Sequence, residues 1–452
     1  MSSLPPAAAG SRRAAVIGAG LSGLTAAYRL RQRGWQVRVF EAGNRVGGRV
    51  QTLARDGFLI DTGASALAQS YTDYLRFADE LGLGGEIAPA APIVGIVRDR
   101  RIHLLHTDRM LRTGLTTRLL SFGSKLRMLR LAVDIAGAKW RGELDYSDMR
   151  RAAPLDDRSA RAYARDRLND EIDTYIGDPI ARTMLITDTD KISRVELYSG
   201  LANIMANKIY SLRGGQQRFA NTLAAELELQ FHSAVQRVQQ RGNTVEIEYT
   251  RDGATALESF DACVVACPLP AATAICVDQR ALLAPLNETL RYTQAITVAV
   301  ATKRPPDTPA FLLQIPGRES AELALMFIEH NKCADRAPAG RGLIGVDWEA
   351  EASAQWATRS DAEISAHTVA GVIALMPELK DQILFTHVTR WPQALPLTEV
   401  GIYRRIGELN AALDPRARIQ FAADYLSAAG QNTAVAFGNR AAARLHAAYG
   451  TG

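Results

Sequence analysis

The chain has little cysteine, little net charge and no long apolar run for its 452 residues. Its four cysteines form no C-x-x-C pair and no zinc-type spacing with histidine, which argues against a disulfide scaffold or a metal site. No uncharged stretch reaches the roughly 18 residues of a membrane-spanning helix. The 53 Lys and Arg against 48 Asp and Glu leave +5, too little at this length to favour nucleic-acid binding.

What is present is an ordinary globular composition, with 47% hydrophobic and 22% charged residues. At about 100–200 residues per domain, the length predicts two or three domains. Residues 1–12 are rich in Ser, Pro and Ala and predict a flexible leader. Glycines interrupt the apolar stretch that follows, which argues against a signal peptide. Sparse cysteine is typical of a reducing compartment, so we expect a cytoplasmic protein.

The order of predicted elements indicates an α/β fold. A short apolar strand at 14–17 precedes a glycine turn, a helix at 24–33 and an alternating strand at 35–40. Residues 111–210 are mostly helical in pattern. Further strands are predicted at 243–249, 261–267, 290–302, 341–348 and 418–422, and Asp252-Gly253 predicts a hairpin turn. A helix follows at about 433–449. The first and last segments both resemble parts of one nucleotide-binding domain, into which a second domain is inserted.

The first glycine-rich turn is a dinucleotide-binding fingerprint. Gly18-Ala19-Gly20-Leu21-Ser22-Gly23 follows a strand and opens a helix, as G-x-G-x-x-G requires. Gly18 allows the tight turn, Gly20 lets a pyrophosphate approach, and Gly23 lets helix and strand pack closely. Glu41 ends the second strand, where a carboxylate accepts hydrogen bonds from a ribose diol. A glycine turn made only for packing would leave this spacing unexplained.

A second glycine pair follows Glu41 directly. Gly47, Gly48 and Arg49 form a candidate phosphate clamp, with backbone approach at the glycines and charge from the arginine. Together with Glu41 and Ala42, this segment resembles the E-x-x-x-R-x-G-G-R signature of the flavin-containing amine oxidase superfamily. The resemblance implies FAD as the cofactor. It also implies a Rossmann-like FAD/NAD(P)-binding domain of the GR2 flavoprotein type, interleaved with an α+β substrate-binding domain that carries a helical insert.

The resemblance implies specific domain bounds. The FAD-binding domain comprises residues 13–84, 208–282 and 388–452, and the substrate-binding domain comprises 85–207 and 283–387, with its helical part at about 111–207.

Further cofactor contacts are implied by blocks spread along the chain. Asp61-Thr62-Gly63-Ala64 resembles the segment beside the flavin, so Gly63 and Ala64 are expected contacts. Val235 resembles the valine whose backbone contacts adenine. Asp424 resembles the acid near the ribityl–phosphate region, although Ala423 stands where the family has glycine. Asn432 and Thr433 open the last helix, whose backbone N–H groups would face the flavin ring.

Within the superfamily, the segment from Arg390 to Pro396 resembles the R-W-P-x-A-x-P block of protoporphyrinogen oxidase-like proteins. Trp391 is therefore a candidate wall of the substrate pocket, and an alternative role is that of a core aromatic. The lysine that the monoamine oxidase group carries near the flavin aligns with Thr297, and its absence argues against a typical amine oxidase. No side chain is predicted to act as a catalytic base.

The resemblance implies an FAD-dependent oxidoreductase that removes a hydride from a C–H bond of a small amine or porphyrinogen-like substrate. Molecular oxygen would accept the electrons and give hydrogen peroxide. Two alternatives remain: a desaturase or dehydrogenase with another acceptor, and a non-catalytic binding protein like the Rab GDP-dissociation inhibitors. The intact Gly47-Gly48-Arg49 and Asp424 favour the enzyme.

The basic, apolar stretch at 124–140 has two interpretations. Lys125, Arg127, Arg130 and Lys139 accompany a broad apolar side, which is typical of a helix packed on its neighbours. The same pattern is typical of peripheral membrane contact. The sequence predicts nothing about oligomeric state.

Overall fold

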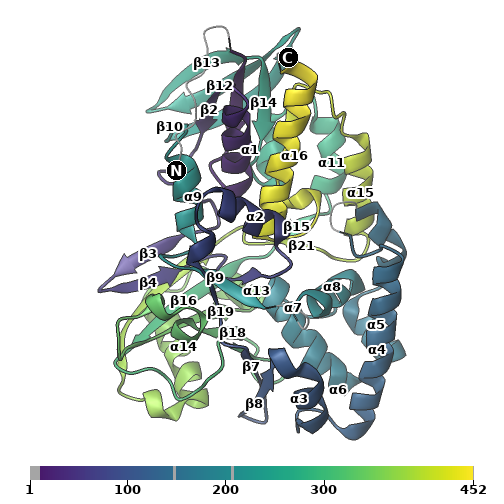
Figure 1. Cartoon of the computed structure of the whole chain (residues 1–452), viewed down its shortest axis with the longest axis vertical. Coiled ribbons are helices and arrows are strands. Elements are labelled where there is room, and N and C mark those ends of the chain that lie inside the picture. Colours follow the sequence, from purple (N-terminus) through teal and green to yellow (C-terminus); the bar gives the residue numbers. More distant parts are fainter. Residues whose placement is uncertain (1–10, 146–148, 205–207, 451–452) are drawn as a thin grey trace.

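A five-stranded parallel sheet draws its strands from both ends and the middle of the chain (Figure 1). The computed structural model describes residues 11–145, 149–204 and 208–450. The strands, in spatial order, are β10 (Glu228–Gln230), β2 (Gln36–Phe40), β1 (Arg13–Ile17), β14 (Ala262–Val265) and β22 (Ile419–Phe421). Every pairing among them is parallel. The predicted α/β fold is thus confirmed, whereas the exact domain bounds stay a prediction.

Alternation along these strands explains how both faces of the sheet are covered. Val16 and Val264 point to one face, where they share a core with α1 (Leu21–Gln32) and α16 (Gln431–Tyr449). Ala15 and Ile17 point to the opposite face and share a core with an antiparallel meander. The meander consists of β11 (Ser233–Arg241), β12 (Thr244–Arg251) and β13 (Ala254–Phe260). The predicted turn at Asp252-Gly253 joins its last two strands.

A seven-stranded mixed sheet forms the second domain. Its spatial order is β20 (Ile383–Trp391), β16 (Ala295–Thr302), β19 (Gly342–Trp348), β18 (Leu323–Ile328), β17 (Leu312–Gln314), β7 (Ile93–Arg98) and β8 (Arg101–His106). Within the described part of this sheet, β7 and β17 pair in parallel and the other neighbouring strands pair antiparallel. The back face of β16 and β19 is apolar, and it shares a core with α14 (Asp361–Leu375), which the lower left of Figure 1 shows beside this sheet.

Helices between β8 and β9 form an insert at the lower right of Figure 1. They are α3 (Met110–Thr116), α4 (Phe122–Trp140), α5 (Ala160–Arg167), α6 (Asp170–Ile172), α7 (Asp178–Leu185) and α8 (Arg194–Ile204), with the shorter η2 (Thr107–Arg109), η3 (Met149–Leu155) and η4 (Asp173–Gly177). This agrees with the helical pattern of 111–210, except that β9 begins at Ile209.

Shorter elements complete the chain. The strands are β3 (Thr52–Arg55), β4 (Phe58–Asp61), β5 (Leu67–Ala68), β6 (Ile87–Pro89), β9 (Ile209–Leu212), β15 (Arg291–Tyr292) and β21 (Pro396–Leu397). The helices are α2 (Thr72–Glu80), α9 (Gln217–Ala224), α10 (Leu269–Ile275), α11 (Arg280–Asn287), α12 (Glu329–Lys332), α13 (Ala350–Trp356) and α15 (Ile402–Ala412). The short helical turns are η1 (Gly84–Glu86), η5 (Ala334–Arg336), η6 (Pro377–Leu379) and η7 (Asp424–Leu426).

Helix α4 has two opposite apolar faces. Leu131 and Ala138 are buried against the rest of the insert. The other face carries a row of solvent-exposed large apolar side chains, here called the α4 stripe: Phe122, Leu126, Leu129, Val133 and Trp140. At about 100° per residue these five fall within an arc of about 60°. The helix is therefore packed on its neighbours along one side only.

Two further predictions concern the ends of the chain and the membrane. Apart from residues 11 and 12, the predicted leader lies outside the described residues. Among the described helices, none is both long enough and apolar enough to cross a bilayer.

Candidate functional site

The first glycine turn has the geometry that its fingerprint predicts. Gly18 has φ +102°, a conformation that side chains rarely adopt. A methyl group at Gly23 would lie 2.0 Å from the Gly18 carbonyl oxygen, so only glycine allows this strand and helix to approach. A methyl group at Gly20 would meet nothing within 4 Å. The backbone at Gly20 therefore borders open space at the N-terminus of α1, where a phosphate would lie.

Glu41 lies beside this turn, as predicted. One carboxylate oxygen accepts a hydrogen bond from the Ala19 N–H at 2.8 Å, and the other accepts one from the Gly43 N–H at 2.8 Å. Glu41 follows β2, so the carboxyl end of a central parallel strand supplies it. Dinucleotides bind at this edge of such sheets.

The two glycine motifs lie against each other. The Gly47 N–H donates to the Ala19 carbonyl oxygen at 2.8 Å, and Gly20 and Gly47 form a parallel bridge. A methyl group at Gly48 would lie 3.2 Å from the Gly20 Cα, at a residue whose φ is already +58°. Sequence reasoning predicted two separate clamps, and the structure combines them into one continuous glycine surface.

Arg49 has two partners within the protein. Its guanidinium lies 2.8 Å from an Asp424 carboxylate oxygen and donates a hydrogen bond of 2.8 Å to the Ala394 carbonyl. Burial lowers the pKa of Arg49, but the Asp424 charge outweighs that effect and raises it. Contact between Arg49 and a phosphate stays a prediction. The ion pair with Asp424 was not predicted from the sequence.

Asp424 retains a free oxygen. The residue is 6% exposed, and its Oδ1 is buried without a hydrogen-bond partner among the described residues. A buried carboxylate oxygen without a donor is costly, so it fits a bound group that supplies hydroxyls. Ala423, which replaces the family's glycine, has φ −154° and ψ 164°. This extended backbone accommodates alanine without strain.

The remaining predicted contacts lie around the same edge. Val235 lies at the start of β11, and this strand is tied to the end of β2 by the hydrogen bond from the Ser233 N–H to the Glu41 carbonyl. Asn432 uses its side chain to accept hydrogen bonds from the Asp73 and Tyr74 N–H groups, and so caps α2. This local role was missed by sequence reasoning. Because the Asn432 side chain is occupied in this way, the predicted contact of Asn432 and Thr433 with the flavin would involve their backbone N–H groups, in the first turn of α16.

Trp391 lies against the segment expected to border the flavin. Its indole N–H donates to the Thr62 carbonyl at 2.7 Å, and a methyl group at Gly63 would lie 3.3 Å from its ring. Gly63 also approaches the Arg49 backbone so closely that a methyl group there would be 2.1 Å from the carbonyl oxygen. The adjacent Ala64 is exposed and donates its N–H to the same carbonyl. Trp391 therefore joins the second sheet to the candidate cofactor loop.

A buried ionic cluster supports that loop, and sequence reasoning did not find it. Arg336 and Lys332 are both fully buried, and Arg336 lies 3.1 Å from Asp61, the residue before Thr62 and Gly63. Lys332 lies 2.6 Å from Glu329 and 4.0 Å from Asp61. These cations come from η5 and α12, far along the chain. In the sequence, the sign of this cluster is that Lys332 and Arg336 follow shortly after the apolar strand β18.

Thr297 and Asp347 form a polar pair on the second sheet. The Thr297 hydroxyl donates to an Asp347 carboxylate oxygen at 2.8 Å, across the paired strands β16 and β19. Burial raises the pKa of Asp347, while the Thr297 hydrogen bond and the Lys332 charge oppose that rise. Thr297 was predicted to replace a lysine of the family, and the acid beside it was not predicted.

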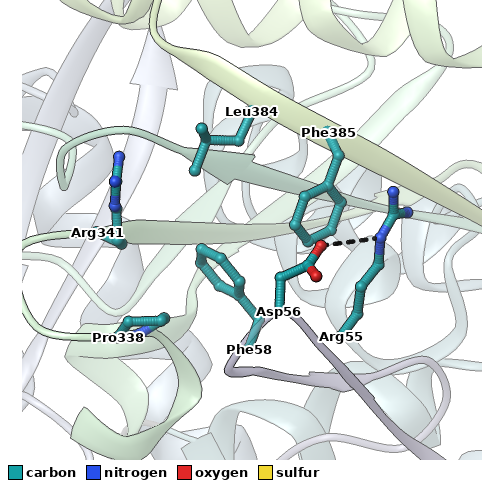
Figure 2. Close-up of a pocket in the computed structure, with 7 residues that line it drawn as sticks. All are labelled: Arg55, Asp56, Phe58, Pro338, Arg341, Leu384 and Phe385. Carbon is teal, nitrogen blue, oxygen red and sulfur yellow. Dashed lines mark ion pairs between the residues drawn. The ribbon is translucent and has the colours of Figure 1, made fainter.

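A hollow of about 460 Å³ elsewhere carries none of the predicted residues. Figure 2 shows its lining, where Phe58 and Phe385 approach each other and Arg55 forms an ion pair with Asp56. The hollow lies between the β3–β4 hairpin and β20. Because no motif residue reaches it, it is separate from the candidate cofactor site.

Together, these features fit FAD. Among the described residues, Gly20 borders open space, Asp424 has a buried oxygen without a partner, and the N-cap residue of α16, Gly430, provides no side-chain cap. The fold and this edge of the parallel sheet define a dinucleotide-binding protein with a second, mixed sheet.

Comparison with known families confirms and narrows this class. The family model described as flavin containing amine oxidoreductase matches residues 21–446. The chain therefore belongs to that family, and it is an FAD-dependent oxidoreductase.

Similar proteins share either part of the sequence or the whole fold. Protoporphyrinogen oxidase 2 of Arabidopsis thaliana is 43% identical over 76 residues, which are 17% of this chain and 15% of that protein. Coproporphyrinogen III oxidase of Staphylococcus aureus is 27% identical over 208 residues, 42% of this chain and 39% of that protein. These alignments thus span well under two thirds of the relatives' lengths.

Among solved structures, a putrescine oxidase mutant covers 97% of this chain and 99% of its own, with a TM-score of 0.79 and 19% identity. Cyclohexylamine oxidase of Brevibacterium oxydans covers 96% and 98%, with a TM-score of 0.75 and 17% identity. At these identities the likeness shows the fold.

Proposed function

We propose that this protein oxidises a small organic molecule by removing a hydride from a C–H bond, and that molecular oxygen is the final acceptor. The observation that carries the proposal is the contact between Trp391 and Gly63, which brings the second sheet against the candidate cofactor loop. FAD, when bound, supplies the two-electron acceptor. Overall, the substrate loses a hydride and a proton, and oxygen gains both to give hydrogen peroxide.

The cofactor contacts are proposed residue by residue. The pyrophosphate is held by the backbone of Gly18, Gly20 and Gly23, together with Gly47 and Gly48. Leu21 and Ser22 would contribute backbone N–H groups from the first turn of α1. Glu41 would bind the adenosine ribose, and the adjacent Ala42 would border it. Val235 borders adenine. Asp424 would accept a hydrogen bond from a ribityl hydroxyl, and Arg49 pairs with its other carboxylate oxygen.

The protein's own contribution is orientation and exclusion of water. Gly63, Ala64 and Trp391 define where substrate meets the cofactor, and the N–H groups of Asn432 and Thr433 favour negative charge at the end of α16. No general base is proposed. The alternative of a non-catalytic binding protein lacks support, because the glycine surface and Asp424 are both present.

The experiment is to measure oxygen consumption and peroxide release by the FAD-loaded protein with amines and porphyrinogens. Equal molar amounts of oxygen consumed and peroxide released are expected with one of these classes. Substrate oxidation that proceeds only with an added quinone or dye would instead favour the dehydrogenase alternative.

We also propose that the α4 stripe contacts an anionic lipid surface. Support comes from Leu129 at 65%, Val133 at 69% and Trp140 at 88% exposure, and from the basic residues Lys125 and Arg130 on the same helix. We expect the protein to sediment with vesicles rich in phosphatidylglycerol, and Leu129→Glu to abolish this. Leu257→Glu, at an exposed leucine of β13, is the matched control. Unchanged sedimentation of Leu129→Glu would contradict the proposal.

A further inference from the structure

The face of the second sheet that points away from α14, here called its front face, carries a carboxylate that takes part in none of the proposed cofactor contacts. Asp347 on β19 is paired in register with Thr297 on β16, and Thr297 is paired with Thr389 on β20. Residues paired in register share a face of the sheet. Trp391 lies two residues beyond Thr389, so it is on that face too.

Neighbouring residues show what this face meets. On one side, Trp391 lies against Gly63 of the candidate cofactor loop. On the other side, Leu325 is paired in register with Asp347 and is buried in the core that includes residues of the helical insert. Asp347 and Thr297 therefore lie between the cofactor loop and the helical insert. An interface between domains is where a small substrate would bind.

Charge distinguishes Asp347 from a structural acid. Among the described residues, no Lys, Arg or His lies within ion-pair distance of Asp347, and its side-chain hydrogen-bond partner is the neutral Thr297 hydroxyl. The cation that influences it, Lys332, lies 2.6 Å from Glu329 and so already has a counterion. Asp347 also keeps partial solvent access, whereas Lys332 has none. Within the described residues, Asp347 is thus a carboxylate without a paired cation, and it is partly exposed to solvent.

A carboxylate in this environment selects the charge of its ligand. It attracts a protonated amine by a charge-assisted hydrogen bond and repels the carboxylates of a porphyrinogen side chain. Thr297 occupies one oxygen of Asp347 and so orients the carboxylate. We propose that Asp347, oriented by Thr297, binds the ammonium group of the substrate, so that the enzyme acts on a cationic amine. This inference rests on the proposed function.

The test compares binding to the FAD-loaded protein and its variants by calorimetry, with butylammonium as the cationic probe and butyrate as the anionic one. Asp347→Asn should weaken butylammonium binding about tenfold or more, because one charged hydrogen bond is lost. It should not weaken butyrate binding. Asp347→Glu, which keeps the charge, should retain most of the affinity. Asp307→Asn, at an exposed acid, is the matched control.

Thr297→Val tests the orienting role separately. It should weaken butylammonium binding less than Asp347→Asn does, and Thr297→Ser should restore it. Equal butylammonium affinity in Asp347→Asn and the unmodified protein would overturn the inference. If Asp347→Asn loses its fold, judged by circular dichroism, loss of butylammonium affinity in the folded Asp347→Glu would overturn it as well.

Failure of this inference is distinguishable from failure of the proposed function. Anaerobic bleaching of the bound FAD by coproporphyrinogen but not by butylamine, benzylamine or a diamine would leave the oxidase function standing and refute the amine assignment. A bound FAD that none of these compounds reduces would refute the function itself. Bleaching by an amine, with a raised half-saturation concentration in Asp347→Asn, would support both.

Discussion

The Arg49 guanidinium lies 2.8 Å from the Asp424 carboxylate and joins a motif near the start of the chain to one near its end. Each motif was predicted to contact the cofactor by itself. The ion pair means that neither acts alone, because one Asp424 oxygen pairs with Arg49 while the other has no partner within the described part of the chain. The cofactor contact at this point is therefore a shared property of two distant segments.

Asp424→Asn should lower FAD affinity more than it lowers the stability of the FAD-free protein. The substitution keeps the volume, but it leaves Arg49 without its counterion and replaces one of the two acceptor oxygens with an amide donor. A rise of about tenfold or more in the FAD dissociation constant is expected. Fluorescence titration of FAD into stripped protein measures it. Glu408→Gln, at an exposed acid of α15, is the control, and equal FAD affinity in the two variants would contradict the assignment.

Two glycines of the first turn should respond differently to alanine. A methyl group at Gly20 meets no protein atom within 4 Å, so Gly20→Ala should fold with an unchanged melting temperature in the absence of FAD, and yet fail to retain FAD. A methyl group at Gly23 would lie 2.0 Å from a carbonyl oxygen, so Gly23→Ala should be strongly destabilised. Thermal melts with and without FAD separate the two. Retention of FAD by Gly20→Ala would exclude a phosphate at that glycine.

Trp391→Ala should reduce turnover at least about tenfold while FAD content stays near that of the unmodified protein. The reason is that the Trp391 ring borders Gly63, whereas among the described residues the side chain holds this loop by a single hydrogen bond, from its indole N–H to the Thr62 carbonyl. Trp391→Phe, which keeps an aromatic wall, should retain more turnover. Equal loss of FAD and turnover in Trp391→Ala would support the alternative role as a core aromatic.

Glu171 should make folding stability depend on pH in the acid range. Burial alone would raise its pKa, but hydrogen bonds from Ser121, Ser124 and Arg98 outweigh it and lower the pKa to about 2, below the usual 4.5. The folded state thus favours the carboxylate, so its stabilisation is present above pH 4.5 and is lost as pH falls toward 2.

Glu171→Gln should therefore cost about 1–2 kcal/mol of unfolding free energy at neutral pH, allowing for solvent screening. The difference from the unmodified protein should shrink as the pH falls from 5 to 3. Urea melts at several pH values measure it. A difference that stays constant over this range would show that the carboxylate charge does not contribute.

Much of the fold was predictable because it depends on local patterns. Strand β1, the glycine turn and α1 follow from alternation, glycine spacing and helical periodicity in adjacent residues. The hairpin at Asp252-Gly253 follows from its turn residues. These elements place the dinucleotide edge of the parallel sheet, so the cofactor class could be predicted as well.

The polar pairs across the chain could not be predicted. The ion pair between Arg49 and Asp424, the hydrogen bond between Thr297 and Asp347, and the burial of Lys332 all depend on how segments distant in the sequence pack together. Asn432 caps a different helix from the one it opens, which no local pattern records. The substrate side of the site depends on such pairs, and this is why sequence reasoning reached the cofactor before the substrate.

The most direct test is the visible spectrum of the purified, FAD-loaded protein during anaerobic titration with candidate substrates, followed by admission of air. The flavin absorbance is predicted to bleach with an amine and to return with oxygen. Release of authentic FAD on denaturation identifies the cofactor. A protein that stays colourless after incubation with FAD, and binds none in titration, would contradict the account at its centre.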